Sequence, residues 1–189
     1  ATEGGATLFH ICYYDREAFL TQSPQLYKEQ LTMAFENVFE IGPIFRAEPS
    51  RTNRHLSEAT SIDIEKAYAD YNDIMEILES LIHFLFDEVK NKNKSQLEYL
   101  KIEIPDISFP FRRYRYSDLI EKLQGAGESI EWGDDISQQK LRNLNDEDMN
   151  NFYFIFDWPT SIKPFYVKPK STGTECESFD LMYDTLELS

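Results

Sequence analysis

Two neighbouring stretches of the chain predict a pair of strands. Residues 37–48 are rich in β-branched and aromatic residues, although Gly42-Pro43 must bend this strand or mark an edge. Residues 58–69 alternate apolar with polar positions, which places Asp63 and Glu65 together on the face opposite the isoleucines. The arginine-rich stretch between them, residues 49–55, then forms a hairpin loop. The pattern therefore predicts an antiparallel pair of strands.

Helical periodicity follows the strand pair. Apolar residues recur at three- and four-residue steps from 74 to 89, which predicts a helix capped by Asn72. Ser23 and Pro24 are typical of the start of a helix, here expected to reach about Phe35. Shorter helices are expected over residues 117–125 and 135–144.

The remaining segments predict further strands. Residues 151–158 and 164–168 are expected to be strands, and residues 178–189 a hairpin turning near Tyr183-Asp184. Adjacent strands are joined by hairpins rather than by crossover helices, which predicts the α+β class with an antiparallel sheet flanked by helices. The section from about 90 to 150 is interpreted as an insertion or lid.

Composition narrows the class of protein. The 189 residues carry 34 Asp+Glu against 19 Lys+Arg, a net charge of -15, yet 41% are hydrophobic, which fits one soluble globular domain rather than an acidic disordered tail. No apolar run is long enough to cross a membrane. Two cysteines are too few for a disulfide framework, so a reducing, cytoplasmic location is expected. Since the chain starts at Ala1, a fragment of a longer protein is expected.

One local cluster departs from the acidic balance. Arg46, Arg51 and Arg54 fall within nine residues and are joined by His55. Arginine binds phosphate oxygens in pairs and stays charged, so a loop folded back over Arg46 would make a clamp for phosphate. These arginines could equally offset surface carboxylates, and the residues alone support both interpretations.

Two pairs of carboxylates also suggest chemistry. Asp63 and Glu65 need a cation, which Lys28 or a substrate ammonium could supply, although solvated strand faces show the same alternation. In the final hairpin, a two-residue loop at Tyr183-Asp184 would place Asp180 directly opposite Glu187. A magnesium ion would relieve that repulsion, whereas a one-residue slip would separate the two side chains.

Several of these residues occur together in the motifs of a known protein family. The sequence resembles motif 2 of class II aminoacyl-tRNA synthetases, with the closest likeness to aspartyl-tRNA synthetases of the archaeal and eukaryotic cytosolic type. The residues that carry the motif are Phe45-Arg46-Ala47-Glu48, Arg54-His55-Leu56 and Glu58-Ala59-Thr60-Ser61-Ile62-Asp63-Ile64-Glu65. Residues 2–9 look like the family's mobile loop, residues 22–28 like its aspartate-recognition segment, and the likeness continues to Tyr183.

The resemblance implies an aspartate–tRNA ligase that uses ATP and Mg²⁺. Aspartate attacks the α-phosphate of ATP to give aspartyl-adenylate and pyrophosphate, and the aspartyl group then passes to tRNA(Asp), with tRNA(Asn) as a further acceptor. The resemblance also implies a homodimer for the full-length protein. Because the chain is expected to lack motif 1, motif 3 and the anticodon-binding domain, it is expected to be a partial catalytic domain that is inactive alone.

The resemblance implies roles for individual residues of this sequence. Arg46 matches the catalytic arginine that holds the α-phosphate, and Asp180 and Glu187 match the magnesium-binding acids. Further ATP contacts are implied for Glu48, Arg54, His55, Glu58 and Glu187. Lys28 is implied to bind the side-chain carboxylate of the substrate. The other residues implied to bind aspartate are Glu3, Ser23, Gln25 and Asp63. Two departures from the family pattern are Ala59, where many relatives have phenylalanine, and Lys163, where arginine is usual.

Two other functions remain open. A paralogue without an anticodon domain could amidate aspartate through the same adenylate, since it would keep motif 2. A non-catalytic interaction module could retain the fold, although the intact Arg46, Lys28, Asp180 and Glu187 argue against lost activity.

Overall fold

The computed structural model describes residues 7–47, 56–144 and 146–188. The chain divides into two compact units, Ala1–Ala69 and Asp70–Ser189. Each unit is described separately below. No helix in the described ranges is both long and apolar enough to cross a membrane.

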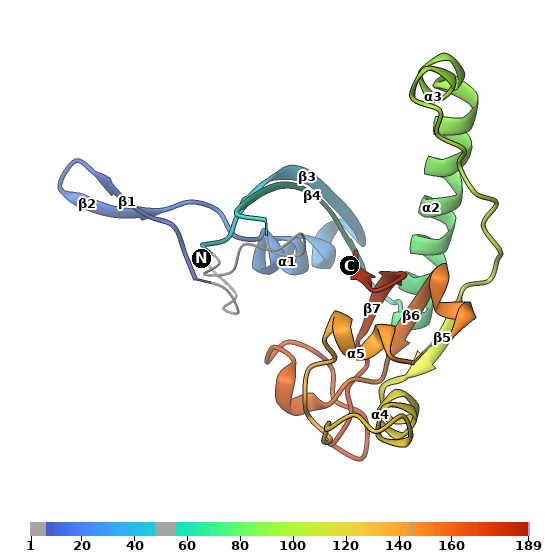
Figure 1. The fold of residues 1–189 in the computed structure, drawn as a ribbon. Coiled ribbons are helices and arrows are strands. Elements are labelled where there is room, and N and C mark those ends of the chain that lie inside the picture. The colour runs from blue at the N-terminus through green and yellow to red at the C-terminus, as the bar shows by residue number, and fades with distance from the viewer. Residues whose placement is uncertain (1–6, 48–55, 145, 189) are drawn as a thin grey trace. The chain divides into compact units, whose positions relative to one another are not determined.

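The first unit is a strand pair packed on one helix. The elements are β1 (His10–Tyr13), β2 (Arg16–Phe19), α1 (Gln25–Phe35), β3 (Asn37–Phe45) and β4 (Glu58–Lys66). The predicted helix and antiparallel pair are thereby confirmed, with β3 and β4 in register from Asn37–Lys66 to Phe45–Glu58. The β1–β2 hairpin, which extends away from α1 (Figure 1), was not predicted, because the four-residue strands are too short for a clear alternation.

A proline lies inside β3 without breaking it. The Phe45 amide donates to Thr21, whereas the Arg46 amide donates to Ser57 at the β4 side. Pro43 shares the orientation of Phe45, two residues on, so its nitrogen faces away from β4 and removes no bond from the ladder.

The second unit is a four-stranded sheet with helices on both faces. Its helices are α2 (Tyr71–Lys92), α3 (Lys94–Leu100), α4 (Tyr116–Gly125) and α5 (Gln138–Arg142), with 3-10 turns η1 (Glu147–Asn150) and η2 (Thr160–Ile162). Its strands are β5 (Arg112–Arg115), β6 (Phe152–Phe156), β7 (Phe179–Tyr183) and β8 (Leu186–Glu187), in the order β5-β6-β7-β8. α2 runs away from the sheet and carries α3 at its far end (Figure 1).

The central strand β6 explains why this unit has two cores. Phe152 and Phe154 pack with Met75 of α2, whereas Tyr153 and Ile155 pack with α4 on the other face. Alternate residues of a strand point to opposite faces, so this wholly apolar strand is covered on both sides. The α+β prediction is confirmed.

Several local predictions were wrong. α2 is capped by Asp70, not Asn72, because the Asp70 carboxylate accepts from two backbone amides and Asp73 reciprocates. Residues 164–168 form turns rather than a strand, with the Val167 amide bonded to Pro164. The sheet is not purely antiparallel, since β5 runs parallel to β6.

The section interpreted as an insertion or lid takes part in the second core. Leu119, Leu123, Ile130, Leu141 and Met149 are all buried there. The insertion or lid within residues 90–150 stays a prediction, and its buried side chains show that part of this span belongs to the folded core.

Candidate functional site

The predicted cation for the β4 carboxylates is Lys28. This lysine comes from α1, and its side chain is only 4% exposed. Its Nζ lies 3.0 Å from Asp63 Oδ1 and 3.2 Å from Glu65 Oε1. The two carboxylates share a face because they are two residues apart on one strand. One buried ammonium group therefore holds two carboxylates on the face covered by α1.

Further polar side chains bond to Asp63 and at the start of α1. Ser61 donates a hydrogen bond to the other oxygen of Asp63. Ser23 Oγ accepts from the Gln25 amide at the start of α1, and Gln25 Nε2 donates to Glu29 at 3.0 Å. The structure thus places Ser23 and Gln25 on the segment that carries Lys28.

Arg46 lies just beyond β3, with its side chain exposed. Its amide bonds to Ser57, so the strand alternation continues and places Arg46 on the same face as Asp63. Glu58 is paired with Phe45 and lies on the other face. Four further residues with predicted roles fall outside the described residues: Glu3, Glu48, Arg54 and His55.

The first unit has a hollow of about 720 Å³ near this face. Ser23, Tyr27 and Glu40 are among its lining residues, together with Leu8 and the chain around Leu20. Glu40 lies directly opposite Asp63 in the strand pair. Neither Lys28 nor Arg46 lines the hollow, so among the candidate residues it includes Ser23 alone.

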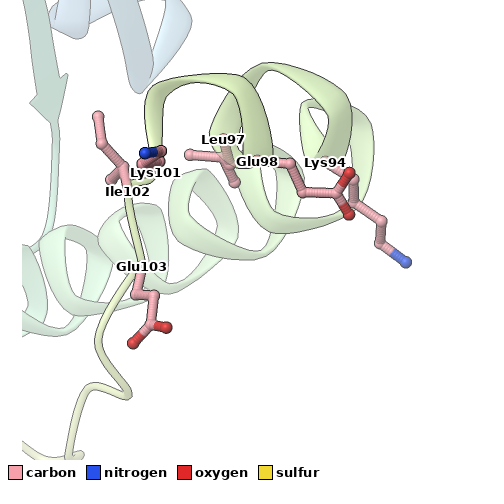
Figure 2. A pocket seen from close by; sticks show the side chains of 6 residues that line it. All are labelled: Lys94, Leu97, Glu98, Lys101, Ile102 and Glu103. Atoms are coloured by element: carbon pink, nitrogen blue, oxygen red, sulfur yellow. The ribbon is translucent and has the colours of Figure 1, made fainter.

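A second hollow, of about 370 Å³, lies in the second unit. Figure 2 shows its lining residues at the corner formed by α3 and the chain that follows. Lys94 and Glu98 point outward from this corner, and the remaining lining residues are Leu97, Lys101, Ile102 and Glu103. No sequence-predicted site residue belongs to it.

The carboxylate of Asp180 lies in the second unit against a lysine. Lys163 Nζ is 2.9 Å from Asp180 Oδ1, and the Asp180 side chain is 15% exposed. Burial raises the pKa of Asp180 to about 6, against the lowering effect of Lys163 and with a further increase from Glu187. The raised pKa of Asp180 is typical of a carboxyl group that is poorly hydrated and lies near another carboxylate.

The predicted register of the last hairpin was wrong by two residues. Met182, not Asp180, lies opposite Glu187, because the loop is Asp184-Thr185 rather than Tyr183-Asp184. The Asp184 backbone adopts φ 52°, which suits a tight turn. Since strand faces alternate every residue, a shift of two keeps Asp180 and Glu187 on the same face as diagonal neighbours.

This pair offers a divalent cation only part of a coordination shell. No group of three or more metal-binding side chains occurs in the described ranges. Magnesium is commonly held by one or two carboxylates together with substrate phosphates and water. Two carboxylates on one face, one of them with a raised pKa caused partly by the other, fit that use.

Sequence reasoning missed two members of these clusters. Glu65 was grouped with Asp63 but given no site role, although the i, i+2 spacing put both carboxylates within reach of one cation. Lys163 was noted only as a departure from arginine. Its contact with Asp180 depends on how the chain from 157 to 178 folds, which no periodicity in the sequence indicates.

Known proteins are similar to this chain over its whole length. The chain is 48% identical over 189 residues to the Aspartate--tRNA(Asp/Asn) ligase of Sulfurisphaera tokodaii and 50% identical over 193 residues to that of Archaeoglobus fulgidus. Each alignment covers 100% of this chain and 44% of the relative. The chain therefore spans less than half the length of these relatives.

Solved structures show the same fold. The asparaginyl-tRNA synthetase of Pyrococcus horikoshii complexed with asparaginyl-adenylate matches with a TM-score of 0.85 and 35% identity, covering 99% of this chain and 44% of that one. The aspartyl tRNA synthetase of Entamoeba histolytica matches with a TM-score of 0.79 and 33% identity, covering 90% and 37%. The family model of class II tRNA synthetases (D, K and N) matches residues 1–189, so the chain belongs to this family.

Proposed function

We propose that the protein is an aspartate–tRNA ligase that activates aspartate with ATP. In the first step an α-carboxylate oxygen of aspartate attacks the α-phosphorus of ATP, and pyrophosphate leaves. In the second step a hydroxyl of the terminal adenosine of tRNA attacks the activated carbonyl, and AMP leaves. The relatives named above, which carry Asp/Asn in their names, support tRNA(Asp) and tRNA(Asn) as acceptors.

The observation that carries this proposal is the buried position of Lys28. An ammonium group has three donors, and Asp63 and Glu65 account for two of them. The third can bind the side-chain carboxylate of aspartate. The two protein carboxylates fix the direction of the ammonium group, which limits the loss of side-chain entropy when substrate binds.

Phosphate chemistry is assigned to Arg46. Its exposed guanidinium can bind two oxygens of the α-phosphate, where negative charge develops during attack. Three residues of the segment between β3 and β4 are proposed to contact ATP: Glu48, Arg54 and His55. Glu58 is proposed to bind the nucleotide, and Glu3 the substrate ammonium.

Magnesium is proposed to be held by Asp180 and Glu187. When bound, the ion would neutralise charge on the phosphates of ATP. Asp180 contributes a mostly buried carboxylate, and Glu187 lies diagonally across the hairpin on the same face. A homodimer and a cytoplasmic location of the full-length protein complete the proposal.

Asparagine is the second candidate substrate, because solved asparaginyl-tRNA synthetases match this fold with a TM-score of 0.85. Lys28 favours aspartate, since a neutral amide gains less than a carboxylate from a fixed cation. Amino-acid-dependent exchange of labelled pyrophosphate into ATP by the full-length protein tests the choice. We expect exchange with aspartate and at most trace exchange with asparagine. Exchange supported equally by asparagine, or absent with aspartate, would contradict the proposal.

A further inference from the structure

Lys163 is enclosed by two groups that attract cations. Its Nζ lies 2.9 Å from Asp180 Oδ1 and 4.5 Å from the centre of the Trp158 ring, and its side chain is 22% exposed. An ammonium over an indole face is attracted by the ring quadrupole. Lys163 is therefore held in place by a carboxylate and an aromatic face together.

The surroundings keep this lysine in position. The Trp158 ring is buried, its indole N–H donates to the Ile155 carbonyl at 3.2 Å, and the Lys163 amide donates to Thr160 at 3.4 Å. Trp158 and Asp180 belong to the same packed unit as Lys163. The contact is thus built into the fold, unlike an exposed ion pair between two mobile side chains.

From this geometry we propose that Lys163 is an internal counter-cation that competes with the divalent cation for Asp180. The proposal rests on the metal role assigned above to Asp180 and Glu187. The ammonium group already satisfies one oxygen of Asp180 and offsets half of the charge of the pair. A divalent cation that approaches must either displace Lys163 or bind beside a positive charge, and both weaken its binding.

This competition has a functional consequence. Two carboxylates that retained their full charge would bind divalent cations without nucleotide. With Lys163 present, the protein alone binds the cation weakly, and the phosphates of ATP must supply the remaining ligands. Lys163 acts through Asp180 and is a positioning residue. As a result of Lys163, the metal site is occupied mainly when the nucleotide is bound.

Binding of Mn²⁺ to the protein without ATP tests the proposal. Electron paramagnetic resonance measures free Mn²⁺ during a titration of wild type and Lys163→Met, which keeps an apolar chain over Trp158 but removes the charge. We expect the Kd for Mn²⁺ to fall tenfold or more in Lys163→Met. Lys163→Arg, which keeps the charge, should stay within about threefold of wild type.

Two controls separate this inference from the metal assignment. Lys168→Met removes another lysine of the same unit, one paired with Glu177 at 2.8 Å, and should leave the Kd unchanged. Asp180→Asn should weaken Mn²⁺ binding. If Asp180→Asn weakens binding while Lys163→Met leaves it unchanged or weaker, the competition is wrong and the metal site stands. If Asp180→Asn has no effect, the metal site is wrong as well. Should Lys163→Met fail to fold, Lys163→Gln replaces it with the same expected change.

Discussion

The ammonium group of Lys28 lies 3.0 Å from a carboxylate oxygen of Asp63, although 35 positions separate the two residues. The contact connects α1 to β4, and Glu65 completes it from the same strand. A lysine with a side chain only 4% exposed is unusual, because a buried charge needs a partner. The contact therefore stabilises the first unit and fixes the position of the Lys28 ammonium group.

Removal of this cation should destabilise the first unit. Lys28→Met leaves Asp63 and Glu65, each with a 23% exposed side chain, without their shared partner. Because water can still reach both carboxylates, the cost of leaving them without a cation is reduced. We expect a loss on the order of 2–4 kcal/mol in the free energy of unfolding. Urea unfolding measures it. Lys66→Met, an exposed lysine on the same strand, is the control and should change stability by less than about 0.5 kcal/mol.

Arg46 should affect the chemical step more than binding of the amino acid. Arg46→Ala removes a group proposed to meet charge that develops in the transition state, so kcat for pyrophosphate exchange should fall about 100-fold or more with little change in the KM for aspartate. Steady-state exchange kinetics measure both constants. Arg16→Ala removes an exposed arginine of β2 and should have no effect on either. A rise in the aspartate KM with kcat intact would argue that Arg46 serves binding instead.

Asp157 should be a major determinant of stability in the second unit. Its side chain is 1% exposed, and its Oδ1 accepts from Tyr71 at 3.0 Å and lies 2.5 Å from Lys170 Nζ. Burial and the Asp157 carboxylate raise the pKa of Tyr71. Asp157→Ala removes the acceptor of the Tyr71 hydroxyl and leaves Lys170 only a longer contact with Glu175, at 3.9 Å. We therefore expect a loss of about 3 kcal/mol in the free energy of unfolding, measured by thermal unfolding.

Backbone strain must be separated from this loss of charge. Asp157 and Asp184 both have positive φ, at 62° and 52°, but Asp184 is exposed. Asp184→Ala therefore reports the cost of alanine in the left-handed region alone. A similar loss in both variants would contradict a special role for the Asp157 ion pairs.

The pH dependence of stability should carry a signature of Asp180. Its pKa is about 6 in the folded protein against 3.8 for the ordinary group, so the folded state binds more protons between these values. Stability contributed by this group is therefore greatest at low pH and is lost as pH rises from about 4 to 6. In EDTA, wild type should lose stability relative to Asp180→Asn over this window. A difference that stays constant, or changes with the opposite sign, would contradict the burial of Asp180.

Local sequence patterns predicted α1, α2, α4, α5 and the β3–β4 pair, but not the short helix α3. The alternation in β4 placed Asp63 and Glu65 on one face, and Lys28 is the cation that this arrangement required. The pairing of charges could be anticipated because it follows from a period of two along one strand.

Contacts that depend on loops could not be predicted in this way. The last hairpin turns at Asp184-Thr185, one residue later than expected, which moves the partner of Glu187 from Asp180 to Met182. Asp180 and Glu187 still lie on the same face of the hairpin only because the register shift is an even number of residues. Lys163 reaches Asp180 from a turn with no periodicity, so only the folded chain reveals the contact.

The most direct test compares kcat/KM for aspartate and for asparagine in pyrophosphate exchange by the full-length protein, with wild type, Lys28→Met and the control Lys66→Met. If Lys28 reads the substrate carboxylate, Lys28→Met should lower kcat/KM for aspartate about 100-fold or more, with a much smaller effect on asparagine, while Lys66→Met behaves as wild type. Circular dichroism verifies that the variants are folded. A folded Lys28→Met that keeps the wild-type ratio between the two amino acids would contradict the account.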